Sequence, residues 1–142
     1  MSKTSENAFV GTWKLVSQHT HFPDGRIEAS RGEGAIGVLM YDAAGNMAVQ
    51  LARTDDHWDE YSDMRELTTA MDGYLGYFGT YEVDATTQTV THRVRGSSFF
   101  GYRNSLQRRH YDFTDADQTL TLMAASPRDG TKRVLIWQRA TE

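Results

Sequence analysis

Apolar and polar residues alternate along much of this chain, most clearly in the segment VGTWKLVSQHTHF, residues Val10–Phe22. Because successive side chains of a β-strand point to opposite faces, alternation of this kind predicts a strand with one buried face. The residues that share the predicted inner face are Trp13, Leu15, Ser17, His19 and His21. This face is apolar where the strand begins and polar where it ends. The pattern therefore predicts a protein interior that is dry at one end and wet at the other.

The same alternation recurs in short segments that are separated by turn residues. Hairpins are predicted where GVLMYD and NMAVQLAR flank AAG, where GTYEVD and TVTHRVR flank ATTQ, and where SLQRRHYDF and TLTLMA flank TDADQ. The turn sequence FPDGR follows the first strand, and KRVLIWQR forms the last one. Roughly eight or more short strands at this spacing are typical of an antiparallel sandwich or barrel.

One stretch has a helical pattern instead. Apolar residues recur every three or four positions from Asp63 to about Leu75, and Asp63 followed by Glu66 fits a capping box. We expect one short helix here. It either covers one end of the β-structure or packs on its surface.

Composition narrows the class of protein. At 142 residues the chain is expected to form one domain, residues 1–142, whose core is large enough to fold without disulfides, and it contains no cysteine. The formal net charge of −4 argues against nucleic acid or an anionic membrane as a partner. The N-terminal MSKTSENAF lacks the apolar core of a signal peptide, and no apolar run approaches transmembrane length. We therefore expect a cytoplasmic protein.

Several short motifs resemble a known family. GTW at Gly11 to Trp13 resembles the Gly-x-Trp signature of lipocalins, and WQR supplies Arg139 where calycin barrels have a late arginine. The runs GVLMYDAAGNMAVQLAR, YFGTYEVDATTQTVTHRV, QRRHYDF and LIWQR are together similar to the bacterial and fungal lipocalin-like domain family over nearly the whole chain. The resemblance implies an all-β fold, a single closed antiparallel up-and-down β-barrel of about eight or more strands, with one short helix. It also implies that Arg139 packs across Trp13 and closes one end.

Strand parity predicts which polar side chains face the interior of such a barrel. His92 shares a face with the two valines of its strand, Arg109 shares a face with Tyr111, and Arg53 ends the apolar face of MAVQLAR. Arg108 should then face solvent, although a register slip of one residue would exchange Arg108 and Arg109. An inward guanidinium needs a carboxylate, several carbonyls or a ligand anion beside it.

A closed barrel of this size has room for side chains or for one small ligand. We expect the cavity to bind a small, largely apolar or aromatic molecule that bears an anionic or polar group. The candidate ligand-binding residues are Tyr41, Arg53, Tyr77, Tyr81, Tyr111 and Trp137. The parity of Tyr41 and Trp137 is ambiguous, because their strands are apolar on both faces.

The alternative function is that of a cofactor-independent isomerase, cyclase or lyase acting on such a molecule. In that case His92 or His19 would act as the acid or base, and Arg109 would stabilise negative charge. A structural role remains open for both inward groups, since His92 can be a hydrogen-bonded core residue and Arg109 can pair with a protein carboxylate. The aromatic residues of SSFFGYRN, with Trp58, either pack locally or form a lid over the barrel mouth.

Metal and cofactor sites have weaker support in the sequence. His19 and His21 could bind zinc or copper if His92 converged on them, but nothing in the spacing fixes that geometry. The chain has no glycine-rich phosphate loop and no nucleophile elbow. We expect no metal and no cofactor. The expected partner is a small molecule, with no nucleic acid and no membrane, and a homodimer is a further possibility.

Overall fold

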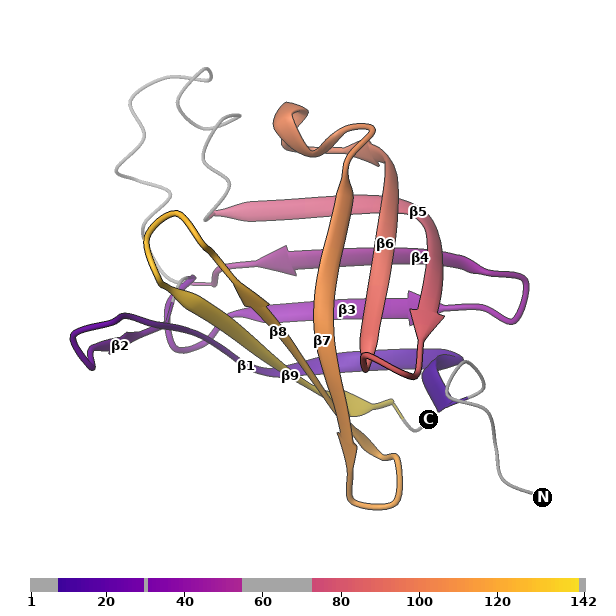
Figure 1. Ribbon diagram of the computed structural model, residues 1–142, viewed down its shortest axis with the longest axis horizontal. Coiled ribbons are helices and arrows are strands. Elements are labelled where there is room, and N and C mark those ends of the chain that lie inside the picture. Colours follow the sequence, from indigo (N-terminus) through magenta and orange to yellow (C-terminus); the bar gives the residue numbers. More distant parts are fainter. Residues whose placement is uncertain (1–7, 30, 55–72, 141–142) are drawn as a thin grey trace.

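The computed structural model describes residues 8–29, 31–54 and 73–140, and nearly all of its regular structure is β-strand (Figure 1). The strands are β1 (Gly11–His21), β2 (Ile27–Glu28), β3 (Ile36–Tyr41), β4 (Asn46–Ala52), β5 (Tyr74–Asp84), β6 (Thr89–Ser97), β7 (Leu106–Thr114), β8 (Thr119–Ala125) and β9 (Lys132–Arg139). Every pair of neighbouring strands is antiparallel. None of the helical segments described is long and apolar enough to cross a membrane.

The sheet closes on itself. Its strand order is β2-β1-β3-β4-β5-β6-β7-β8-β9, with a further pairing between β1 and β9, so that β1 and β3 to β9 form a closed eight-stranded barrel. The short strand β2 pairs with β1 only at the two positions Thr20↔Glu28 and His21↔Ile27. Figure 1 shows β3, β4 and β5 side by side and β9 lying along β1. The predicted closed antiparallel up-and-down barrel is confirmed.

The predicted helix is wrong at its C-terminal end. Residues 63–72 lie outside the described part of the chain, but Tyr74 and Leu75 belong to β5. Leu75 and Tyr77 are buried while Tyr74 and Phe78 are exposed, which is the period of two expected of a strand. A short 3-10 turn, η2 (Phe100–Tyr102), lies between β6 and β7. That residues 1–142 form one domain stays a prediction.

The end of the barrel at which β1 begins is closed and dry. Phe9 is fully buried there and meets the rings of Tyr41, Tyr111 and Phe113 edge-on, with centroids 4.9 to 5.1 Å apart. The indole nitrogen of Trp13 donates a hydrogen bond to the carbonyl of Phe9 at 2.9 Å, which holds this plug against β1. Edge-on aromatic contacts of this kind stabilise a core beyond the area that they bury.

Arg139 completes this closed end. Its guanidinium lies 4.2 Å from the centroid of the Trp13 ring, and the two residues are also register partners in β1 and β9. The same guanidinium donates hydrogen bonds to the carbonyls of Val10 at 2.8 Å, Ala8 at 2.7 Å and Asp117 at 3.1 Å. The contact implied by the family resemblance is therefore present. It joins the N-terminal segment, β9 and the β7–β8 turn.

The hairpin turn between β3 and β4 follows the local sequence. The carboxylate of Asp42 accepts hydrogen bonds from the backbone N–H groups of Ala44 and Asn46, as in an Asx turn. Gly45 has a φ of +95°, a backbone conformation that residues with a Cβ rarely adopt. The predicted hairpin at AAG is confirmed.

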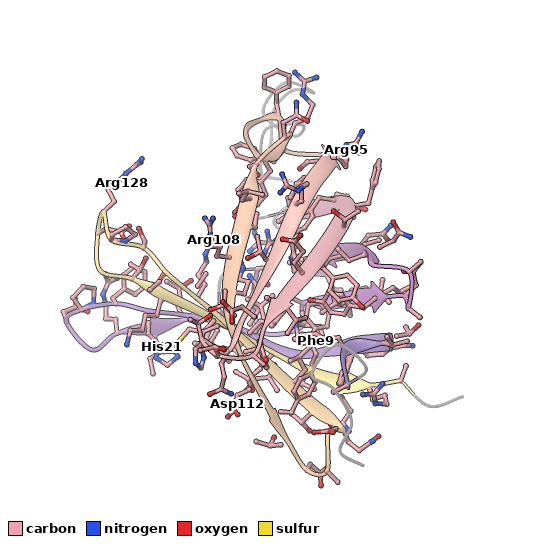
Figure 2. All side chains as sticks on the ribbon, turned by 45° about the vertical axis from the view of Figure 1, so that its right-hand side comes forward. Phe9, His21, Arg95, Arg108, Asp112 and Arg128 are labelled. Carbon is pink, nitrogen blue, oxygen red and sulfur yellow. The ribbon has the colours of Figure 1, made fainter. Side chains whose placement is uncertain are left out.

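A β-bulge in β1 reverses which residues of this strand face inward beyond Leu15. The register with β9 shifts between Leu15 and Ser17, so Val16 is an extra residue and its side chain is 59% exposed. Beyond the bulge Gln18 is buried, and His19 and His21 lie on the outer face. The prediction that His19 and His21 face the interior is wrong. Figure 2 shows His21 near the end of β1 that is remote from Phe9.

A denaturation experiment tests the closed end. Trp13→Ala should lower the free energy of unfolding by roughly 3 to 5 kcal/mol, since a fully buried ring and its contact with Arg139 are both lost. Urea unfolding followed by circular dichroism measures the change. Phe100→Ala is the control, because this ring is 73% exposed and should contribute less than about 0.5 kcal/mol. Equal losses in the two variants would contradict the assignment of Trp13 to the closing contact.

Candidate functional site

The opposite end of the barrel contains a small cavity. Its volume is about 50 Å³, which is room for a few water molecules. Leu39, Val49 and Trp137 line it on the side of the core, and Leu51, Leu122 and Leu135 line its walls. Its polar lining comes from Gln18, Arg31, Tyr77, His92, Tyr102, Arg109 and Arg133. No aspartate or glutamate among the described residues lines this cavity.

His92 lies in the inner layer of this site between two tyrosines. It is 2% exposed, as strand parity predicted, and its Nε2 lies 2.7 Å from the hydroxyl of Tyr41. Its Nδ1 lies 2.7 Å from the hydroxyl of Tyr77. Both ring nitrogens are therefore occupied by tyrosine hydroxyls. Neither ring nitrogen is therefore free to contact a molecule in the cavity.

The three groups of this network are neutral at physiological pH. Burial, helped by the positive charge of Arg109, lowers the pKa of His92 to about 3. Burial raises the pKa of Tyr77 to about 12 even though Arg109 acts in the opposite direction. Burial and the neighbouring Tyr77 raise the pKa of Tyr41 well above its ordinary value. None of the three side chains therefore gains or loses a proton near neutral pH.

Two arginines and a tyrosine form the outer part of the site. Arg109 is partly buried on the inner face of β7, where its guanidinium donates to the Gln107 side-chain oxygen at 3.3 Å and to the Arg108 carbonyl at 3.0 Å. Arg133 donates to the Tyr102 hydroxyl at 3.4 Å. Burial raises the pKa of the Tyr102 hydroxyl, but the charges and hydrogen bonds of Arg133 and Arg109 outweigh burial and lower the pKa below its ordinary value. Both guanidinium groups therefore act on one phenol oxygen.

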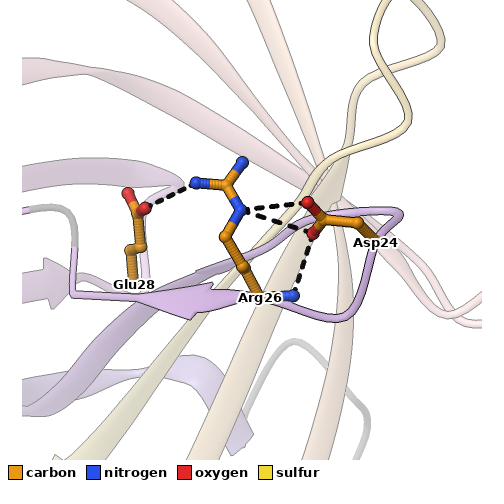
Figure 3. A network of polar contacts seen from close by, with 3 residues as sticks. All are labelled: Asp24, Arg26 and Glu28. Atoms are coloured by element: carbon orange, nitrogen blue, oxygen red, sulfur yellow. Dashed lines mark hydrogen bonds and ion pairs between the residues drawn. The ribbon is translucent and has the colours of Figure 1, made fainter.

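Neither Arg109 nor Arg133 contacts a carboxylate within the described ranges. Figure 3 shows how a paired arginine of this protein looks: Arg26 contacts Asp24 at 3.1 Å and Glu28 at 2.9 Å. That network lies on the exposed hairpin between β1 and β2, where water screens it and its contribution to stability is small. Arg109 and Arg133 have no such counter-charge among the described residues. The predicted inward orientation of Arg109 is confirmed, since this residue lines the cavity. Arg108, on the other face of β7, is exposed (Figure 2).

Two buried polar atoms beside the cavity have no hydrogen-bond partner among the described residues. They are Oε1 of Gln18, an acceptor, and Nε1 of Trp137, a donor. Their strands are neighbours, since Leu15 pairs with Trp137 and Gln18 pairs with Leu135 across β1 and β9. A buried polar atom without a partner is destabilising by about 1 to 3 kcal/mol. Both residues line the cavity, although the two atoms themselves are shielded from solvent.

The structure brings together only part of the predicted site. Tyr77, His92, Arg109 and Trp137 line the cavity. Four further candidates are buried but do not line the cavity. Tyr41, Tyr81 and Tyr111 belong to the core cluster, and Arg53 lies just beyond β4. Tyr81 donates a hydrogen bond to the Asp42 carbonyl at the closed end, which suits a structural role. His19 lies on the outer face and not in the cavity.

Tyr102 lines the cavity and belongs to SSFFGYRN, whose aromatic residues were expected either to pack locally or to form a lid. Arg133 and Gln18 were missed, for different reasons. Arg133 could have been found, because counting back by twos from Arg139 through Trp137 leads to it. The same count resolves the ambiguity of Trp137, which is 1% exposed and points inward. The inward orientation of Gln18 could not be predicted, because nothing in the sequence marks the bulge that turns this side chain inward. Around His19 and His21 no group of three metal-ligating side chains forms within the described residues.

The fold and the site define a closed antiparallel β-barrel that is sealed at one end and has a cationic cavity at the other. The chain belongs to the lipocalin-like domain family, whose model matches residues 10–140. Comparison with curated proteins gives no significant match.

Solved structures show similarity over almost the whole chain at low identity. A redesigned β-barrel is 13% identical, with 96% of each chain covered and a TM-score of 0.51, which supports the barrel fold alone. A variant of the fluorescent protein UnaG is 13% identical, with 96% of this chain and 99% of that chain covered and a TM-score of 0.45. The amine binding protein of Rhodnius prolixus, in its tryptamine complex, is 14% identical, with 99% of this chain and 67% of that chain covered and a TM-score of 0.46.

The low pKa of His92 predicts how stability depends on pH. An unfolded histidine titrates near 6.5, whereas folded His92 titrates at about 3. Between these values the unfolded chain binds a proton that the folded protein does not, so acid favours unfolding. The contribution of His92 is complete above pH 6.5 and falls on the order of 1.4 kcal/mol per pH unit below it.

Urea unfolding at several pH values between about 5 and 7 measures this slope. His92→Gln should reduce it, because the substituted side chain does not titrate. His110→Gln, at an exposed position of β7, should leave it unchanged. An unchanged slope in the His92 variant would show that this histidine takes up protons alike in both states.

Proposed function

We propose that the end of the barrel that contains the cavity binds a small organic anion with an apolar body. The observation that carries this proposal is the pairing of two guanidinium groups, Arg109 and Arg133, with an apolar cavity that holds no described carboxylate. A partly buried charge that lacks a counter-charge is costly to hold, so a protein gains little stability from such an arrangement. A ligand carboxylate, enolate or phenolate would supply the missing charge.

Apolar and cationic surfaces are separated within this cavity. Trp137, Leu39 and Val49 lie toward the core, whereas Arg109 and Arg133 lie toward the mouth beside Tyr102. This separation supports an amphipathic ligand, with its apolar body inward and its anionic group outward. Small-molecule sites generally combine a mainly apolar lining with a few polar groups that fix orientation.

The volume of the cavity restricts how such a ligand enters. Typical small-molecule pockets measure about 300 to 1,000 Å³, far more than the cavity of about 50 Å³ seen here. Arginine side chains are long and flexible, and side-chain rotations are common when proteins bind. We propose that Arg109 and Arg133 fill the mouth in the empty protein and swing aside, or onto the anion, when it binds.

The enzyme alternative has no particular observation in its favour. His19 lies on the outer face, and both ring nitrogens of His92 are hydrogen-bonded to tyrosines. The proposal is therefore a binding protein rather than an isomerase, cyclase or lyase. A cytoplasmic location, a homodimer and the absence of nucleic-acid partners stay predictions of the sequence.

Titration with carboxylates and their amides tests the proposed function. Benzoate, phenylacetate and hexanoate are added to the ¹⁵N-labelled protein, and backbone NMR shifts give the affinities. Benzamide, phenylacetamide and hexanamide have nearly the same shapes without the charge. Each acid should bind more tightly than its amide, with shifts concentrated in β6, β7 and β9. Acids that bind no better than amides, or do not bind at all, would contradict the proposal.

Substitution of Arg109 tests which charge is responsible. Arg109→Leu should weaken benzoate binding by about 2 kcal/mol, roughly thirtyfold, through loss of a charge-assisted hydrogen bond. Folding stability should hold or rise, because a charge without a carboxylate partner is removed. Arg109→Lys should restore only part of the affinity, since lysine lacks the planar fork. Arg108→Leu is the matched control: it removes the same charge from the exposed face of the same strand.

A further inference from the structure

We infer that His92 carries its proton on Nδ1 and that the Tyr77 hydroxyl therefore points its own hydrogen into the cavity, where it binds an oxygen acceptor of the ligand. This inference rests on the proposed function and makes it more specific. It assigns Tyr77 as a residue that contacts the ligand, with His92 and Tyr41 as the residues that position its hydrogen. The ligand class becomes an organic anion whose charged oxygen is bound by Tyr77 and Arg109 together.

The first step is the count of hydrogens in the network. A neutral imidazole has one N–H donor and one nitrogen acceptor, and each tyrosine hydroxyl has one hydrogen to donate. His92 contacts Tyr41 through Nε2 and Tyr77 through Nδ1, both at 2.7 Å. One tyrosine must therefore donate to the ring and the other must accept from it. The tyrosine that accepts keeps its own hydrogen for another partner.

The second step is the surroundings of Tyr41. It is 2% exposed, and its ring packs against Phe9 and Tyr81 in the dry part of the barrel. Within the described residues its hydroxyl has no acceptor other than His92. If Tyr41 accepted from Nε2, its own hydrogen would be buried without a partner, a loss of about 1 to 3 kcal/mol. Tyr41 therefore donates to Nε2, and the proton of the ring resides on Nδ1.

The third step follows for Tyr77. Nδ1–H donates to the Tyr77 oxygen, which leaves the hydroxyl hydrogen of Tyr77 without an acceptor in the described protein. Unlike Tyr41, Tyr77 lines the cavity. Its side chain is 7% exposed, so this hydrogen meets the cavity rather than bulk solvent. An unsatisfied donor on a residue more than nine-tenths buried indicates an acceptor from outside the described residues, and we assign this acceptor to the ligand.

The fourth step is the chemistry of that acceptor. Arg109 lines the same cavity, and its positive charge reaches the hydroxyl of Tyr77 and the ring of His92. A guanidinium and a directed O–H together match an anionic oxygen, which accepts several hydrogen bonds at once. An ammonium group would be repelled by Arg109 and would offer Tyr77 no acceptor. The network therefore selects anionic oxygen against amines.

Two measurements test this inference. Long-range ¹H–¹⁵N correlation spectra of the histidine rings show which nitrogen carries the proton, and His92 is identified by substituting the other four histidines with glutamine. The expected result is a neutral ring with protonated Nδ1 in the protein without ligand. A ring protonated on Nε2 would overturn the inference, whether or not benzoate binds.

The second measurement is the affinity for benzoate. Tyr77→Phe removes only the hydroxyl and should weaken binding about tenfold, whereas Tyr74→Phe, on the exposed face of the same strand, should not change it. Tyr41→Phe should let the ring populate both tautomers and so weaken binding less than Tyr77→Phe does. Unchanged affinity in the Tyr77 variant would overturn its donor role. If the wild-type protein binds acids no better than amides, the proposed function is wrong. The tautomer of His92 still shows whether Tyr41 or Tyr77 donates to the ring.

Discussion

The contact between Arg139 and Trp13 is the constraint on which the rest of the barrel depends. A guanidinium 4.2 Å from the indole centroid also binds carbonyls of the N-terminal segment and of the β7–β8 turn. These bonds fix where β9 lies along β1, and closure of a barrel links the register of one strand pair to all the others. Which side chains face inward, and at what depth, therefore follows from this contact.

Most of the fold could be predicted from alternation alone, and the site only in part. Parity succeeded for His92 and Arg109, because buried apolar residues of the same short strands set the inner face. It failed for His19, because one inserted residue, Val16, reverses every position that follows. Val16 is apolar and would suit either face, so nothing in the sequence marks the bulge. The same irregularity brought Gln18, an unpredicted side chain, to the cavity wall.

The inner face of the barrel changes from aromatic to polar over a few residues. Phe9, Tyr41 and Tyr111 fill the closed half by ring contacts, and Tyr41 and Tyr77 then contact the two nitrogens of His92. His92 is thus the point at which the dry core meets the cavity. Its low pKa has the same origin, since burial and Arg109 both disfavour a second positive charge there. A neutral histidine at this depth can direct hydrogen bonds without adding to the positive charge of the mouth.

If the proposed function holds, stability and ligand binding depend on different ends of the same strands. β9 carries Arg139 at the closed end, where backbone carbonyls satisfy its guanidinium. It carries Arg133 at the cavity end, where the described residues offer a phenol and no carboxylate. The two arginines of this strand thus differ: Arg139 is satisfied by backbone carbonyls, whereas we propose that Arg133 binds the anion of a ligand. Barrels that share a fold can host unrelated ligands. This separation gives a physical reason: residues of the mouth can change while the closing contact, and hence the register of the whole sheet, stays the same.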